Sequence, residues 1–222
     1  MTVTHHIDEA TVLAFAAGTL DESASVIVAA HLAMCDGCHS NVREAEKLGA
    51  VLLGNILQEE MSPASLDAMM ERIESSAFDD GEDAAAHETD EKAHYNVPRP
   101  LARHMDWPLE EVPWRRVAPG ISVCELSLSK AALGTLKLVR VAAAKKIPAH
   151  GHKGSEKTLV LKGWFKDENG KFAAGDISEM DSDAEHTLVV GDEEDCICAV
   201  AIEGQMQFKG LVGRIMQPFV GI

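Results

Sequence analysis

The sequence lacks the long apolar segment that a membrane-spanning helix needs. No apolar run approaches the roughly 18 residues typical of such a helix, and the longest candidates are short, such as Cys196–Ile202. The N-terminus, MTVTHHIDEA, has no basic region followed by an apolar core, so it does not indicate a secretory signal. We therefore expect a cytoplasmic protein with no membrane partner.

Cysteines and, in the first half, basic residues are also scarce. Five cysteines in 222 residues fit metal or thiol roles in a reducing compartment better than a disulfide framework. With 46% apolar and 25% charged residues, a wholly disordered or collagenous chain is excluded. Residues 1–97 hold 19 acidic and four basic residues, whereas residues 98–222 hold 17 and 16. This negative field repels nucleic acid and attracts a basic partner, although solubility alone would also account for it.

The first half has the apolar spacing of helices. Asp8 and Asp21 are suitable N-caps, and Asp36-Gly37 is expected to break the pattern. The predicted helices cover residues 8–17, 21–34 and 38–57, and a fourth starts at Ser62-Pro63. The fourth helix has one apolar side, which is either a core face or a groove-binding surface. That side consists of Leu66, Met69, Met70 and Ile73.

The second half has the pattern of an all-β domain. Short runs rich in β-branched residues alternate with turn residues, as in a β-sandwich or barrel. These runs are residues 121–128, 135–142, 158–165, 186–190, 196–202 and 205–210. The acidic stretch before them has few large apolar residues and is expected to be a solvated linker. The predicted organisation is a helical domain over 1–77, a linker over 78–97 and a β domain over 98–222.

One candidate metal site lies in the helical half. His31 and Cys35 are four residues apart, which places them on one helical face, and Cys38 follows across the expected turn at Asp36-Gly37. Zinc prefers four nitrogen or sulfur ligands in a tetrahedron, and His6 is a candidate for the fourth. His5 and His39 compete with it for this role. Two buried free thiols or a redox CxxC pair are the alternatives to a metal site.

A second candidate site lies in the β half. His150 and His152 are two residues apart, so they share one side of a strand, and Glu156 follows after a turn. His186 is the remaining histidine further along the chain and would complete the site. Three imidazoles and a carboxylate suit zinc, iron, manganese or nickel. Surface histidines at a polar barrel mouth are the alternative.

Three further cysteines lie in the β half. Cys196 and Cys198 are two apart on one predicted strand, and Cys124 lies on another. We interpret all three as core residues, because cysteine packs as a small hydrophobe. Joint oxidation of Cys196 and Cys198 is a secondary hypothesis.

The motifs resemble two known families in order along the chain. HxHxxxE followed by a glycine after six intervening residues, in His150–Gly163, resembles the first motif of the cupins, which are conical β-barrels with a central metal. Gly175-Asp176 stands at the glycine turn of the second motif, and His186 comes later than usual. HLAMCDGC at 31–38 resembles a zinc-binding anti-sigma domain, and the ordered pair resembles the ChrR family of bacterial anti-sigma factors. The implied fold is multi-domain α + β: a small zinc-stabilised helical domain followed by a cupin-type β-barrel, or jelly roll.

The resemblance also implies a mechanism. ChrR-like proteins bind an extracytoplasmic-function sigma factor, here as a 1:1 complex, through the helical domain and keep it from core RNA polymerase. The cupin-like domain is needed for release under singlet oxygen or related oxidants. The resemblance implies a structural zinc on His6, His31, Cys35 and Cys38, and a second zinc on His150, His152, Glu156 and His186.

Two other functions remain open at this point. Many cupins are dioxygenases or isomerases that use the same ligand types, so a metal-dependent enzyme with an accessory helical zinc domain is the main alternative. Four protein ligands leave few open positions for a substrate, and we therefore expect a non-enzyme. A module that holds a small ligand in the barrel is the third hypothesis.

Overall fold

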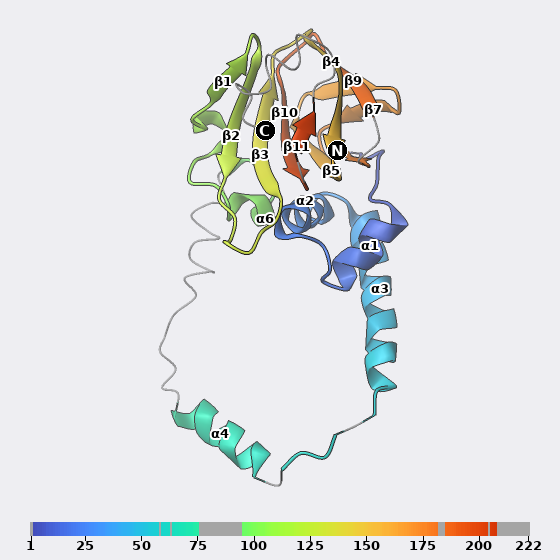
Figure 1. Cartoon of the computed structure of the whole chain (residues 1–222), viewed down its shortest axis with the longest axis vertical. Helices are drawn as coiled ribbons and strands as arrows, with labels where there is room; N and C mark the ends of the chain where they lie inside the picture. The colour runs from blue at the N-terminus through green and yellow to red at the C-terminus, as the bar shows by residue number, and fades with distance from the viewer. Residues whose placement is uncertain are drawn as a thin grey trace.

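The structure is a computed structural model (Figure 1). It describes residues 2–57, 59–62, 64–75, 95–181, 185–203 and 205–207, with the backbone alone for residues 150–153, 185 and 205–207. Most of the predicted acidic linker, and positions 208–210 of the last predicted strand, lie outside the described residues.

The predicted N-caps begin the first two helices. Asp8 accepts a hydrogen bond from the N–H of Thr11 at the start of α1, and Asp21 accepts one from the N–H of Ser23 at the start of α2. The helices are α1 (Glu9–Ala16), α2 (Glu22–Leu32), α3 (Asp36–Gly54), α4 (Ser65–Ser75) and α6 (Arg99–Ala102), with a 3-10 turn at Leu109–Glu111. Within the described part of the chain, none of these helices is long and apolar enough to cross a bilayer.

The start of α3 corrects the sequence prediction. Asp36-Gly37 does not break the chain but forms the first turn of α3, which therefore begins two residues before Cys38. The reason is that Cys35 is the N-cap: its backbone is extended, and its sulfur accepts the N–H of Cys38 at 3.5 Å. The helix also ends at Gly54, three residues before the predicted end.

The β half forms two antiparallel sheets that face each other (Figure 1). The six-stranded sheet has the order β1-β2-β3-β10-β5-β8, and the five-stranded sheet has the order β11-β4-β9-β6-β7. The strands are β1 (Arg115–Ala118), β2 (Ile121–Leu126), β3 (Thr135–Val141), β4 (Lys146–Lys153), β5 (Glu156–Lys162), β6 (Trp164–Asp167), β7 (Gly170–Ala173), β8 (Ile177–Met180), β9 (Glu185–Val190), β10 (Cys196–Ile202) and β11 (Gln205–Gln207).

One of the predicted strands corresponds to two strands in the structure. The run 158–165 divides at Gly163 into the end of β5 and the start of β6, which belong to different sheets. Gly163 has φ +70°, and a Cβ there would lie 2.8 Å from the carbonyl oxygen of Asp195. Only glycine therefore allows the chain to turn here from one sheet to the other.

The helices and the six-stranded sheet share a hydrophobic core. α2 packs against β3, β5 and β10, and its buried residues Ile27 and Val28 belong to the same apolar cluster as Leu138 and Leu159 of the sheet. Burying large aliphatic side chains stabilises a fold by about 2 kcal/mol each. The helical segment is thus held to the barrel by apolar packing as well as by sequence connectivity.

Candidate metal centre

Four metal-binding side chains converge where α2 meets α3. His6 lies just before α1, His31 in the last turn of α2, Cys35 at the N-cap of α3 and Cys38 in its first turn. Their ligand atoms all lie within 4.8 Å of one another. The cluster therefore joins three segments that the chain alone would hold only loosely.

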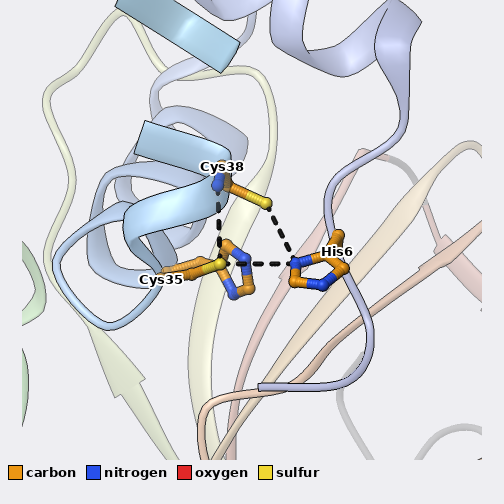
Figure 2. A group of neighbouring side chains, drawn as sticks. His6, Cys35 and Cys38 are labelled. Atoms are coloured by element: carbon orange, nitrogen blue, oxygen red, sulfur yellow. Dashed lines mark hydrogen bonds between the residues drawn. The ribbon is translucent and has the colours of Figure 1, made fainter. Parts of the chain in front are cut away.

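The distances in the cluster match a tetrahedral metal site. His6 Nδ1 lies 3.3 Å from Cys35 Sγ and 3.4 Å from Cys38 Sγ (Figure 2). Ligand atoms around a tetrahedral zinc, at bond lengths of about 2.0 Å to nitrogen and 2.3 Å to sulfur, are separated by roughly 3.3–3.8 Å. These three side chains are thus arranged as zinc ligands would be.

His31 is oriented as a neutral ligand. Its Nδ1–H donates to the carbonyl oxygen of Gly175 at 3.0 Å, which leaves the lone pair of Nε2 available. Nε2 is buried and has no hydrogen-bond partner among the described residues. Desolvation lowers the pKa of His31, so the ring is uncharged at neutral pH. A bound metal ion would satisfy the buried Nε2.

The two thiols complete a donor set suited to zinc. Cys35 and Cys38 are buried, and burial raises the pKa of Cys38 to about 11. A metal ion would bind the thiolate and displace this proton. Two sulfur and two imidazole nitrogen ligands are a common set for structural zinc, so the cluster could hold that ion.

The structure places the two competing histidines away from this cluster. His5 stacks on Phe172 of β7, with ring centroids 4.0 Å apart. His39 is exposed on α3. His6 is therefore the histidine that joins His31 and the thiols.

The second predicted set lies on three strands of the barrel. β4 pairs with β9 so that His150 is directly opposite His186, and His152 follows on β4. Glu156 begins β5 in the other sheet and is buried, with one carboxylate oxygen 3.0 Å from the Oγ1 of Thr158, which donates to it. His186 is also buried, and its Nδ1 lies 3.9 Å from Oδ2 of Asp167. The side chains of His150 and His152 lie outside the described residues, so this metal site remains a prediction.

A small apolar cavity of about 90 Å³ lies between the two sheets, lined by strands of both. Glu156, Cys196 and Cys198 are among its lining residues. The two sulfur atoms are 3.7 Å apart, and both thiols are buried and free, as is that of Cys124. The cysteines therefore pack as core residues in the structure.

Comparison with known proteins now assigns the family. The anti-sigma-E factor ChrR of Cereibacter sphaeroides is 35% identical over 222 residues, which is 100% of both chains. This chain belongs to the ChrR family of anti-sigma factors. A family model described as the ChrR Cupin-like domain matches residues 104–207. The crystal structure of Rhodobacter sphaeroides SigE in complex with the anti-sigma ChrR matches with a TM-score of 0.76 and 33% identity, over 90% of this chain and 99% of that chain.

The family assignment confirms the fold predicted from the sequence, namely N-terminal helices followed by a cupin-like antiparallel β-sandwich. It also places the His/Cys cluster in the N-terminal half of a ChrR-type anti-sigma factor.

Sequence reasoning missed the contacts by which the barrel of this ChrR-family chain holds its helical half. Asp176, in the turn between β7 and β8, accepts hydrogen bonds from the backbone N–H groups of Thr4 and His5 at 2.6 and 2.9 Å. Glu179 of β8 accepts from the N–H of Asp8 and is paired with Lys157. Their N-terminal partners Thr4, His5 and Asp8 are about 170 positions away, and no local pattern signals these contacts. In the sequence, the only indication of these contacts was the Gly175-Asp176 turn.

Proposed function

We propose that this chain is a zinc-dependent anti-sigma factor that binds an extracytoplasmic-function sigma factor one to one and keeps it from core RNA polymerase. The main support is the full-length match to a protein named anti-sigma-E factor ChrR. A structure of such a ChrR in complex with SigE also matches 90% of this chain.

An exposed apolar surface on α3 and α4 is the surface best suited to the sigma factor. α3 projects from the body of the molecule and α4 lies apart from it (Figure 1). On α3, Leu52 and Leu53 are 63% and 70% exposed, and on α4 all residues are exposed or half-buried. An apolar surface of this kind is typical of a protein interaction site. The α4 stripe of Leu66, Met69, Met70 and Ile73 is exposed, which favours the partner-binding interpretation over a core face.

The charge distribution of the chain also favours a sigma factor as the partner. The first 97 residues carry a large acidic excess, whereas a protein that binds promoter DNA presents basic surfaces. An acidic domain attracts such surfaces and can cover them. No direct contact with nucleic acid is proposed for this chain.

The zinc would have a structural role in this function. His6, His31, Cys35 and Cys38 would hold it, and it would fix the base of α3 against α2 and the segment before α1. Because the exposed apolar residues of α3 lie beyond that base, loss of the metal would release the helix that presents them. Structural zinc supplies folding free energy to domains of this size.

For the barrel we propose a second metal ion, bound by His150, His152, Glu156 and His186, and a role in releasing the sigma factor under oxidative stress such as singlet oxygen. The supporting observations are the pairing of His150 with His186 and the burial of Glu156 and His186. Zinc is our first choice for the metal, although iron, manganese or nickel suit the same ligands.

We propose that the chain is not an enzyme. The relative that matches over the full length is an anti-sigma factor, and the helical half has no purpose in a simple cupin dioxygenase or isomerase. The enzyme alternative predicts iron or manganese in the barrel and turnover of a small substrate.

The test is co-expression of the full chain with an extracytoplasmic-function sigma factor from the same genome. We expect a 1:1 complex with about two zinc ions per chain. Replacing both Cys35 and Cys38 with serine is expected to abolish the complex while the barrel stays folded. The matched control is Cys124→Ser, which removes a buried free thiol outside the cluster. An intact complex in the double variant would contradict zinc-dependent binding.

A further inference from the structure

The turn between β7 and β8 contacts His31 of the N-terminal cluster and the segment that leads into His6. The carbonyl oxygen of Gly175 accepts the Nδ1–H of His31. The next residue, Asp176, binds the chain directly before His6. One turn of the barrel thus contacts two segments that are 25 residues apart and that both carry a ligand.

Both carboxylate oxygens of Asp176 accept hydrogen bonds. Its Oδ1 accepts the N–H of Thr4 at 2.6 Å and that of His5 at 2.9 Å, and its Oδ2 accepts the hydroxyl of Thr4 at 3.0 Å and the N–H of Ala173 at 2.9 Å. The residue is only 2% exposed. The N–H of Ile177 also donates to the carbonyl of His5. These bonds fix the backbone of the segment that ends at His6.

The charge of Asp176 supports this role. Burial alone raises the pKa of Asp176, but the hydrogen bonds from Ala173, Thr4 and His5 outweigh burial and hold the pKa below its ordinary value. The carboxylate is therefore ionised, and hydrogen bonds to a charged group are about twice as strong as neutral ones.

We infer that the β7–β8 turn positions the zinc site: Asp176 fixes the backbone that presents His6, and the carbonyl of Gly175 fixes the tautomer and ring orientation of His31. Asp176 is a positioning residue in this scheme, since it acts through His6 and does not touch the metal. The inference rests on the proposed zinc site. It makes the metal affinity of the helical half depend on the conformation of the barrel.

The barrel strands beside this turn carry two of the predicted ligands of the second metal. β8 follows the turn and pairs with β5, which begins at Glu156. Phe172, just before the turn, stacks on Phe165 of β6, which pairs with β9, the strand that carries His186. A conformational change inside the barrel can therefore reach the turn through paired strands and packed side chains. Such coupling is reciprocal, so each proposed metal site would affect the metal affinity of the other.

The test is a cobalt titration of the full chain, followed by the thiolate-to-cobalt charge-transfer band. This band reports on a metal ion with cysteine ligands, and the four predicted ligands of the barrel metal include no cysteine. Loss of a residue that orients a ligand weakens metal affinity by roughly 10–100-fold. We expect Asp176→Ala to bind cobalt at least tenfold more weakly and to shift the ligand-field bands, and Asp176→Asn to lie between it and the unmodified chain.

The matched control is Asp195→Asn. Asp195 also accepts a backbone N–H, that of Ala143, and it is paired with Arg140, but both contacts lie within the barrel. Its cobalt affinity should equal that of the unmodified chain. A role of Asp176 in barrel stability alone would lower the melting temperature without changing the cobalt spectrum.

Unchanged affinity and spectrum in a folded Asp176→Ala chain would overturn the inference. If that variant does not fold, Thr4→Val decides, because it removes only the hydroxyl donor and leaves the barrel intact. It should weaken cobalt binding by about threefold, and unchanged binding would again overturn the inference. Absence of the charge-transfer band in the unmodified chain would instead refute the zinc site itself.

Discussion

His5 stacks on Phe172 of the barrel, while the adjacent His6 faces the sulfur atoms of Cys35 and Cys38. The two neighbouring side chains thus point to different parts of the molecule. One side of this segment therefore docks on the barrel and the other side contributes to the metal site. The geometry separates two adjacent histidines that are indistinguishable by residue type.

This division predicts opposite outcomes for two neighbouring substitutions. His6→Ala should abolish metal binding at the Cys35–Cys38 site, because it removes a ligand. His5→Ala should keep the metal bound but loosen the segment, since it removes the contact with Phe172. Cobalt spectra measure the first effect, and hydrogen exchange of the Thr4 and His5 amides measures the second. Loss of the cobalt spectrum in His5→Ala alone would mean that the ligand is misassigned.

Metal affinity at the N-terminal site should rise with pH. Without metal, the Cys38 thiol keeps its proton at neutral pH, because desolvation raises its pKa to about 11. Binding expels this proton, so higher pH favours the bound state, by about tenfold in affinity per pH unit for each proton released. His31 adds no proton, since desolvation lowers its pKa. Zinc competition at pH 6.5, 7.5 and 8.5, with an indicator dye for released protons, measures this. A pH-independent affinity would contradict it.

The ion pair between Lys157 and Glu179 should stabilise the joint between α1 and the barrel. Their Nζ and Oε1 atoms are 2.7 Å apart, and the side chains are only 9% and 13% exposed. Lys157 also donates to the hydroxyl of Thr11. Lys157→Met should cost about 3 kcal/mol of unfolding free energy, because it leaves a buried carboxylate without its cation. Urea unfolding in excess zinc measures the loss.

A second variant separates this effect from lost packing. Adding Glu179→Leu to Lys157→Met removes the unpaired charge, so the double variant should regain part of the lost free energy. A double variant that is less stable by the sum of both single effects would show that the pair is not coupled.

The apolar surface of α3 should determine sigma-factor binding without affecting the fold. Leu52→Lys places a charge on a side chain that is already 63% exposed, so its effect on stability should be within about 0.5 kcal/mol. Binding of the sigma factor should weaken by tenfold or more, because the substitution puts a charge into the proposed apolar interface. Leu133→Lys is the matched control, because Leu133 is 91% exposed on the barrel. Equal binding by both variants would place the interface elsewhere.

Much of the local structure could be predicted from the sequence because it depends on near neighbours. The caps at Asp8 and Asp21 and the strand Cys196–Ile202 follow from short-range patterns. The spacing of His31, Cys35 and Cys38 likewise identified a cluster that the fold brings together. The start of α3 was misplaced because a cysteine sulfur acts as the N-cap, a role usually taken by Ser, Thr, Asp or Asn.

The rest depends on contacts between distant parts of the chain. Whether His5 or His6 faces the thiols is decided by Phe172 and Asp176, and neither could be located relative to the N-terminus from the sequence. The division of the run 158–165 depends on the carbonyl of Asp195 beside Gly163. Such information appears only when the two sheets and the helices are assembled.

The length of α3 beyond the shared core has a consequence for the life of the protein in the cell. A chain without its partner displays a row of leucines on a helix that stands out from the body, and this is the kind of surface that chaperones and proteases act on. Surplus copies would be removed, while copies in a complex would be protected. Partner binding would then set not only the activity of this chain but also its abundance, and the two proteins would be kept close to equal numbers.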